Sequence, residues 1–383
     1  MKNTKLSVFI LIFSIGFLFT NISIPQGLSI ANLGKIPESC TIFTAAIGDK
    51  VFFGNNEDFL LDGTYMWFFP SQEIEIPNGT LLTHGSIFFG FDNNYNHPAD
   101  GRVMGGMNDQ GLCFDINGLS DIIKLNLYPE REEIYSWALG NEGLQVLWEC
   151  STVNDTIEWF ESHHPYSYIA WQIHFADATG DAVVISGGDD GELVYTRKGN
   201  STYLISTNFN VANFSSWPHE CWRYDTAKSY LEALSDEESL TVDYCRDILD
   251  AVSTSETSYS NIFDPIQFDI YVYYEHRYSK VIKLNLEEEL ANITTGINGE
   301  PTTLGDMLSY WGEFTLKAIR IADLFQTDYS WNYYPDTPEP SSLNPWLLIP
   351  LILGITGLVI GSVVGVIYGS KHLIRYFKKL RMK

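Results

Sequence analysis

Short apolar runs, bounded by glycine, asparagine and aspartate, recur through the middle of this chain. Runs of this kind, rich in β-branched and aromatic residues, are typical of β-strands. They predict strands at residues 65–69, 87–91, 113–117, 171–176, 181–185, 203–207, 270–274 and 280–286. Longer stretches with apolar residues at helical spacing predict helices at 132–150, 153–163 and 308–325, and another that begins near Cys221. This alternation of hairpins and amphipathic helices indicates an α+β fold.

The clearest hairpin begins at Cys40. An apolar, β-branched run at 40–47 is followed by Gly48-Asp49, a two-residue turn signal, and by a second apolar run at 50–53. With this turn at the centre, Ile47 faces Lys50, and the pairing continues outward along the two strands.

At the open end of the hairpin, this register places Cys40 opposite Glu57, with Asn56 and Asp58 beside it. A thiol, two carboxylates and a carboxamide therefore lie close together. Because buried polar groups cost free energy unless they satisfy one another, the arrangement suggests a functional site. The alternative is that Cys40 is an ordinary buried strand residue or one half of a disulfide.

The N-terminal segment has the pattern of a secretory signal. Lys2 and Lys5 precede a largely apolar run at 6–19, and we expect a signal peptide at 1–31. The alternative is an uncleaved membrane helix, which the short length of the apolar run disfavours.

The C-terminal segment predicts a membrane anchor. A Pro-rich linker at 331–345 precedes residues 346–368, which carry no charge and have the length of a membrane span. The tail at 369–383 holds six basic residues and no acidic one, which places it in the cytoplasm. We therefore expect a single-pass type I protein of the cell membrane, with its main domain outside at 40–330. Glycines four apart on one face of the span could mediate a homodimer: Gly357, Gly361 and Gly365.

Charge and ligand spacing exclude several classes of partner. The chain has 23 Lys/Arg and 48 Asp/Glu residues, a formal net charge of −25, and such a surface repels nucleic acid. The pair His163-His164 has no partner at metal-ligand spacing, and Asp189-Asp190-Gly191 lacks the remaining ligands of a calcium loop. We therefore expect neither a metal nor another cofactor.

Several motifs carry a resemblance to a known family. They are, in chain order, CTIF (40–43), GNNEDF (54–59), GMNDQGL (106–112), HFADATGDAVVI (174–185), STNF (206–209) and CWR (221–223). Together they resemble the choloylglycine hydrolase and penicillin V acylase group of N-terminal-nucleophile hydrolases, to which isopenicillin N acyltransferase and acid ceramidase are related. The resemblance implies a four-layer αββα sandwich over residues 40–330.

The resemblance also implies a nucleophile and its base. In that group the mature chain begins with a nucleophilic cysteine, here Cys40, so residues 32–39 would be a short propeptide. The free α-amine of the same residue titrates near pH ~8 and can accept the thiol proton. Asp58 would orient this amine, and Arg223 would support the nucleophile, although a helix-surface arginine is a competing interpretation of that position.

Four asparagines complete the implied site. Asn208 and Asn117 would donate hydrogen bonds to the oxyanion; the alternatives are a strand-ending asparagine and an ordinary turn former before glycine. Asn55 and Asn56 would bind substrate. Asn55 stands where bile-salt hydrolases usually carry arginine, so the sequence does not support bile-salt specificity.

The function that follows is a membrane-anchored amidohydrolase that cleaves a linear, non-peptide acyl amide through an acyl-enzyme. Its partner would be a small-molecule acyl amide. An acyltransferase, in which an amine replaces water, and a catalytically silent surface-binding domain remain alternatives.

The other cysteines allow two interpretations. Export permits disulfides, and an even set remains besides Cys40, namely Cys113, Cys150, Cys221 and Cys245. Buried free thiols are the alternative.

Topology gives the first testable prediction. Protease treatment of intact cells should cut the linker at 331–345 and release a soluble fragment of roughly 300 residues, while a tag on the tail stays protected. Removal of that tag from outside, with the main domain left intact, would mean that the orientation is reversed.

Overall fold

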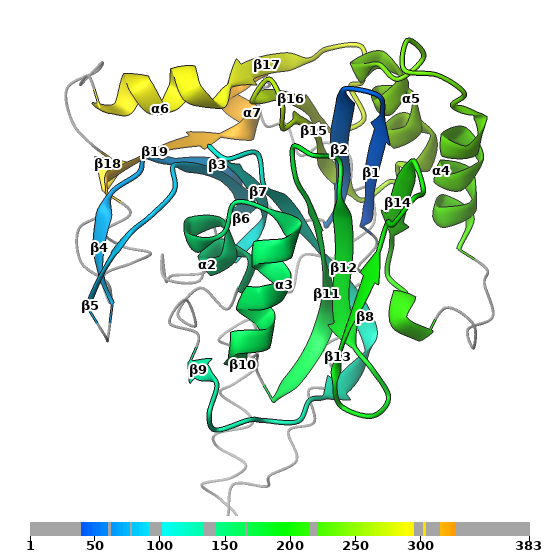
Figure 1. The fold of residues 1–383 in the computed structure, drawn as a ribbon. Helices are drawn as coiled ribbons and strands as arrows, with labels where there is room; N and C mark the ends of the chain where they lie inside the picture. The colour runs from blue at the N-terminus through cyan, green and yellow to red at the C-terminus, as the bar shows by residue number, and fades with distance from the viewer. Residues whose placement is uncertain are drawn as a thin grey trace, which may run out of the picture. The chain divides into compact units, whose positions relative to one another are not determined.

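Two antiparallel β-sheets form the centre of the computed structural model (Figure 1). The six-stranded sheet has the order β14 (Tyr203–Ser206), β1 (Thr41–Ile47), β2 (Lys50–Asp58), β15 (Thr257–Asp264), β16 (Asp269–Tyr274) and β17 (Ile282–Asn285). The nine-stranded sheet has the order β13 (Leu193–Arg197), β12 (Ala182–Gly187), β11 (Tyr168–Ala176), β8 (Cys113–Lys124), β7 (Arg102–Asn108), β6 (Ser86–Phe91), β3 (Thr64–Phe69), β19 (Thr315–Arg320) and β18 (Thr302–Thr303). Two small ribbons join β4 (Glu73–Ile76) to β5 (Gly79–Leu82) and β9 (Glu132–Glu133) to β10 (His163–His164).

The structure describes residues 40–59, 63–76, 79–91, 102–133, 142–164, 167–213, 221–294, 302–303 and 315–325. All of them lie in the first of two compact units, Met1–Thr327. The predicted signal peptide, propeptide, linker, membrane span and tail lie outside the described residues. Within those residues, no helix combines the length and apolar character needed to cross a membrane.

Strand alternation gives each large sheet two different faces. Phe53 and Phe263 of the six-stranded sheet stack on each other, and their neighbours Phe89 and His174 belong to the nine-stranded sheet, so this face packs sheet on sheet. The next residues along the strands, such as Phe52 and Ile262, pack instead with the helices in a separate core. Because both faces are covered, strands β2 and β15 are buried almost throughout.

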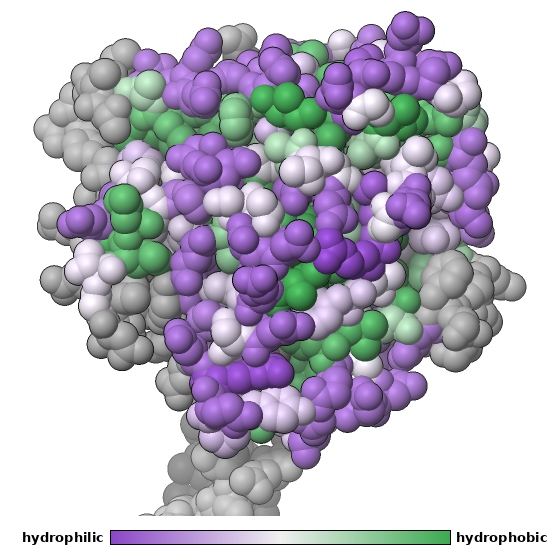
Figure 2. Space-filling view, in the orientation of Figure 1, coloured by the Kyte–Doolittle hydropathy of each residue, from purple (hydrophilic) through white to green (hydrophobic). Residues whose placement is uncertain are grey.

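Helices cover the outer faces (Figure 1). Helices α4 (Trp222–Ala233) and α5 (Val242–Val252) pack on the six-stranded sheet, and α2 (Glu142–Glu149) and α3 (Val153–Ser162) share a core with the nine-stranded sheet. Short helices η4 (Val211–Asn213), α6 (Leu286–Thr294) and α7 (Ile321–Leu324) follow strands. Figure 2 shows one face of the molecule, mainly hydrophilic with small apolar patches, as expected for an acidic chain.

Three predicted elements differ from the structure. The helix predicted at 308–325 is wrong for Thr315–Arg320, which forms strand β19 and pairs with β3, and the described residues are helical only at α7, Ile321–Leu324. The helix predicted at 132–150 begins only at Glu142 in the described residues, and Glu132–Glu133 is a short strand. The strand predicted at 280–286 ends at Asn285, where α6 begins. In the first two cases strand pairing overrides local helical periodicity.

All five cysteines are free thiols in the structure. Cys113, Cys150 and Cys245 are buried, and burial raises their thiol pKa values. Of the two interpretations of these cysteines, the structure supports buried free thiols.

One buried histidine connects the two large sheets. His174 of β11 contacts Thr44 Oγ1 of β1 through Nε2 and Ser206 Oγ of β14 through Nδ1, each at 3.0 Å. Burial lowers the pKa of His174 to about 3, so the ring is neutral in the folded chain.

This histidine makes stability depend on pH. Between its ordinary pKa of 6.5 and about 3, the unfolded chain binds a proton that the folded chain does not. The stability that neutral His174 contributes should therefore be lost as the pH falls through this window, by up to ~1.4 kcal/mol per pH unit. Urea unfolding at several pH values should show a shallower pH dependence for His174→Gln than for the wild type. Equal slopes for the two proteins would contradict this assignment.

Candidate active site

The hairpin that carries Cys40 has the predicted register. Ile47 pairs with Lys50 and Thr41 with Asn56. At its open end, the Cys40 thiol donates to Glu57 Oε1 at 3.5 Å. Cys40 is only 3% exposed, so its thiol is enclosed by protein.

The guanidinium of Arg223 holds this end of the hairpin. Arg223, near the start of α4, is buried and donates through Nη1 to the carbonyl oxygen of Cys40 at 2.6 Å and to Thr41 Oγ1 at 3.0 Å. Its Nη2 donates to Asn208 Oδ1 at 3.0 Å, and its Nη1 lies 4.0 Å from Asp58 Oδ2. Arg223 is therefore not a helix-surface residue, and it connects three of the other predicted site residues.

Asp58 is fully buried beside this group. Its Oδ1 accepts a short hydrogen bond from the Thr257 hydroxyl, and its Oδ2 faces Arg223. Because a buried charge must be balanced by a partner or by hydrogen bonds, these contacts fix the direction of the carboxylate.

Asn208 follows β14 and is half-buried. Arg223 occupies its carbonyl oxygen, while its Nδ2 donates to the Gly118 carbonyl at 3.0 Å. A carboxamide nitrogen carries two hydrogens, so the second N–H can donate to a further acceptor. The hydrogen bond from Arg223 to Oδ1 sets the orientation of the Asn208 amide.

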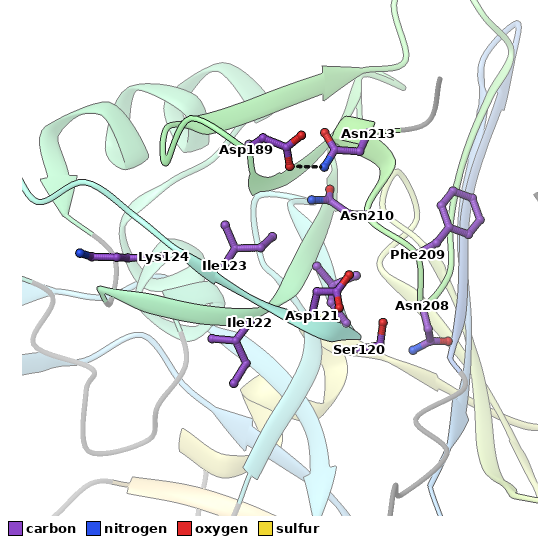
Figure 3. Close-up of a pocket in the computed structure, with 12 residues that line it drawn as sticks. Ser120, Asp121, Ile122, Ile123, Lys124, Asp189, Asn208, Phe209, Asn210 and Asn213 are labelled. Atoms are coloured by element: carbon purple, nitrogen blue, oxygen red, sulfur yellow. Dashed lines mark hydrogen bonds between the residues drawn. The ribbon is translucent and has the colours of Figure 1, made fainter. Parts of the chain in front are cut away.

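A cavity of about 300 Å³ adjoins Asn208 (Figure 3). Its polar lining includes Ser120, Asp121, Lys124, Asp189, Asn210 and Asn208 itself. The cavity can hold a small molecule beside the amide of Asn208.

The other predicted asparagines have different surroundings. Asn117, on β8, is fully buried, and neither end of its amide has a hydrogen-bond partner among the described residues. Asn55 donates to Asn261 Oδ1 at 3.5 Å. Asn56 donates to the Leu249 carbonyl at 2.8 Å and accepts from Ser260, so its side chain joins the sheet to α5.

Acidic neighbours and burial keep the thiol protonated. Burial raises the pKa of Cys40 well above its usual value, and the charges of Glu57, Asp58 and Asp115 raise it further. A hydrogen bond from the Asp58 backbone lowers it, but less than these effects raise it. Cys40 therefore needs a proton acceptor before it can react.

Two further titratable groups lie near the thiol and were not among the residues predicted from the sequence. Asp115 and Tyr259 are fully buried, and the pKa of each is raised well above its usual range by burial and by the charge of Glu57. Asp115 is an acidic residue within the apolar start of β8, and this pattern in the sequence could have marked it as a candidate site residue. Among the described residues, no group of three His, Cys, Asp or Glu side chains is arranged to hold a metal.

Comparison with known proteins gives the fold. No family model matches the sequence, and no curated protein matches it. A mutant of conjugated bile acid hydrolase from Clostridium perfringens has a similar structure, with a TM-score of 0.50 and 14% identity, over 65% of this chain and 93% of that one. Penicillin V acylase from Agrobacterium tumefaciens gives a TM-score of 0.50 and 17% identity, over 66% of this chain and 87% of that one. The predicted resemblance is thus confirmed for the fold.

The contacts of Arg223 predict a large effect on stability. Arg223→Met removes the cation that faces Asp58 and a donor to three other groups, so the free energy of unfolding should fall by about 3–5 kcal/mol. Arg246→Met is the control, because its pairs with Asp243 and Asp247 lie at the surface and should contribute less than about 1 kcal/mol. Urea unfolding measures both, and equal losses would contradict the role given to Arg223.

Proposed function

We propose that this chain is an amidohydrolase that cleaves a linear, non-peptide acyl amide, with Cys40 as an N-terminal nucleophile. The observation that carries the proposal is the Arg223 contact set, which holds the Cys40 backbone, Asp58 and the oxygen of Asn208 in one group. The fold shared with a conjugated bile acid hydrolase and a penicillin V acylase supports the same reaction class.

In the proposed mechanism, cleavage after Ser39 frees the α-amine of Cys40. This amine accepts the thiol proton, and Asp58 orients it. Sulfur attacks the amide carbonyl carbon, and the negative charge on the carbonyl oxygen is stabilised by the second N–H of Asn208 and by Asn117. The protonated α-amine gives its proton to the leaving nitrogen as the C–N bond breaks, and the amine product leaves. Water then attacks the thioester and gives a proton to the α-amine, the C–S bond breaks, and the thiolate takes that proton back.

The substrate would approach from the cavity beside Asn208, which supports binding of a small acyl amide there. Asn55 would contact the substrate, because it lies two residues before Glu57 on the same face of β2. The contacts of Asn56 with Leu249 and Ser260 give no support to a substrate-binding role for that residue.

The location follows from the apolar segments at both ends of the sequence. We propose a single-pass type I protein of the cell membrane, with the domain at 40–330 outside, the span at 346–368 and the basic tail at 369–383 in the cytoplasm. The glycines of this span support a homodimer in the membrane.

The nucleophile is tested by substitution. Cys40→Ala should lower hydrolysis of a panel of N-acyl amines at least ~10³-fold, because no other group replaces the attacking sulfur. Cys150→Ala is a matched control, since Cys150 is also a free thiol with 3% exposure and packs in the core with α2 and α3. Amine release measures turnover, and N-terminal sequencing of the mature protein should begin at Cys40.

Two results would contradict the proposal. The first is full turnover by Cys40→Ala. The second is a mature chain that begins between Ala31 and Lys35 and keeps Cys40 internal, which would favour a surface-binding domain instead.

A further inference from the structure

Gln172 is a fully buried side chain that contacts the backbone on both sides of Asn208. It lies on β11, and its Nε2 donates to the carbonyl oxygens of Thr207 at 2.7 Å and of Phe209 at 2.9 Å. Its Oε1 accepts from the backbone N–H of Val211 at 3.1 Å. Both amide hydrogens and the amide oxygen of Gln172 are therefore engaged by one short segment of backbone.

The chemistry of these contacts fixes the direction of the Gln172 amide. Two carbonyl oxygens face its nitrogen, and one backbone N–H faces its oxygen. A reversed amide would place oxygen against oxygen and N–H against N–H, and buried backbone groups need hydrogen-bond partners. Gln172 therefore has one favourable orientation, and it holds the segment around Asn208 in one place.

The same face of β11 holds the preceding residue of this segment as well. His174 lies two residues beyond Gln172 and so shares its face of the strand, and its Nδ1 contacts Ser206 Oγ at 3.0 Å. Asn208 itself donates from Nδ2 to the Gly118 carbonyl of β8 at 3.0 Å. The segment is thus held to the nine-stranded sheet before, at and after Asn208.

Gln172 also lies beside the second asparagine of the proposed oxyanion site. In the sheet it pairs with Asn117 of β8, so the two side chains stand on the same face. Asn117 belongs to the nine-stranded sheet, whereas Asn208 follows β14 of the six-stranded sheet. The relative position of the two asparagines therefore depends on contacts between the sheets, and Gln172 makes three of them.

We propose that Gln172 is a positioning residue that keeps Asn208 at the distance from Asn117 at which both amides can face one oxyanion. This inference rests on the proposed function and adds a residue to its site. Oxyanion donors act at about 2.7–3.1 Å from the charged oxygen, and a displacement of about 1 Å can lower the rate about 10²-fold. Gln172 acts through the backbone on either side of Asn208 and needs no contact with the substrate.

The test compares turnover with thiol reactivity in the mature full-length chain. Gln172→Met keeps the length of the side chain and removes all three hydrogen bonds. For the N-acyl amine that the wild type hydrolyses fastest, kcat should fall about 10- to 100-fold, with KM changed less than about threefold. Labelling of Cys40 by iodoacetamide should stay within about twofold of the wild-type rate, because alkylation of a thiol forms no oxyanion.

This labelling separates positioning from folding. Cys40 is only 3% exposed, so a loosened fold would change its labelling rate together with turnover. Gln172→Asn is a milder second variant, because it keeps an amide that is one methylene shorter. It cannot make all three contacts from the same backbone position, so it should lose part of kcat and label at the wild-type rate.

Gln145→Met is the matched control, since it makes the same substitution at another fully buried glutamine. Gln145 lies on α2, where its Nε2 donates to Glu149 Oε1 at 2.9 Å. Helix α2 packs with Ile173 of β11, which points to the opposite side of the strand from Gln172. The kcat of Gln145→Met should therefore stay within about twofold of the wild type.

A double variant tests whether Gln172 acts through Asn208. Addition of Gln172→Met to Asn208→Ala should lower kcat by less than about twofold further, because no amide remains to be displaced. If the loss in the double variant equals the product of the two single losses, Gln172 acts elsewhere and the inference is overturned.

The other outcomes are equally distinct. Wild-type kcat in Gln172→Met, with Cys40→Ala inactive, would overturn this inference and leave the proposed function intact. Altered labelling of Cys40 in both Gln172→Met and Gln172→Asn would assign Gln172 to folding in general and overturn the inference as well. Full turnover by Cys40→Ala would instead overturn the proposed function, and the role of Gln172 with it.

Discussion

The register of the β1–β2 hairpin is the constraint on which the candidate site depends. Side chains alternate between the two faces of a strand, so a slip of one residue would exchange every contact. Glu57 would then face the helices, and Asn56 would lie beside the thiol. Two features fix this register. The turn at Gly48 has a φ of 60°, which suits glycine, and sets the pairing of β1 with β2, while β15 pairs with the other edge of β2.

This alternation also divides the charges of the site. Glu57 and Asp58 are adjacent in sequence but point to opposite sides of β2. Asp58 meets Arg223 from α4, whereas Glu57 lies on the side of Tyr259 and Asp115. The end of β2 therefore supplies an ion pair on its helix side and an acidic group between the sheets. The Cys40 carbonyl accepts from Arg223 of the ion pair, and the Cys40 thiol donates to Glu57 of the acidic group.

The parts of the molecule that could be predicted from sequence are those set by neighbouring residues. Strand alternation and the Gly48 turn gave the pairing of Cys40 with Glu57, and the helix that begins near Cys221 was predicted on the basis of its apolar spacing. Strand β19 was missed because its pairing with β3 joins segments far apart in the chain. Asp115 was missed for the same reason, since its approach to Glu57 depends on how two sheets stack. Arg223 was named through the resemblance, but only the structure distinguishes its buried contacts from a surface position.

The contact between Arg223 and the Cys40 carbonyl has a consequence for the proposed cleavage after Ser39. A newly exposed chain end normally frays, because its backbone loses the restraint of the preceding residue. Here the restraint acts on the carbonyl of Cys40 and on Thr41, both on the C-terminal side of the bond after Ser39. Cleavage of that bond would leave both contacts available, so the mature chain can keep its first residue in the same place.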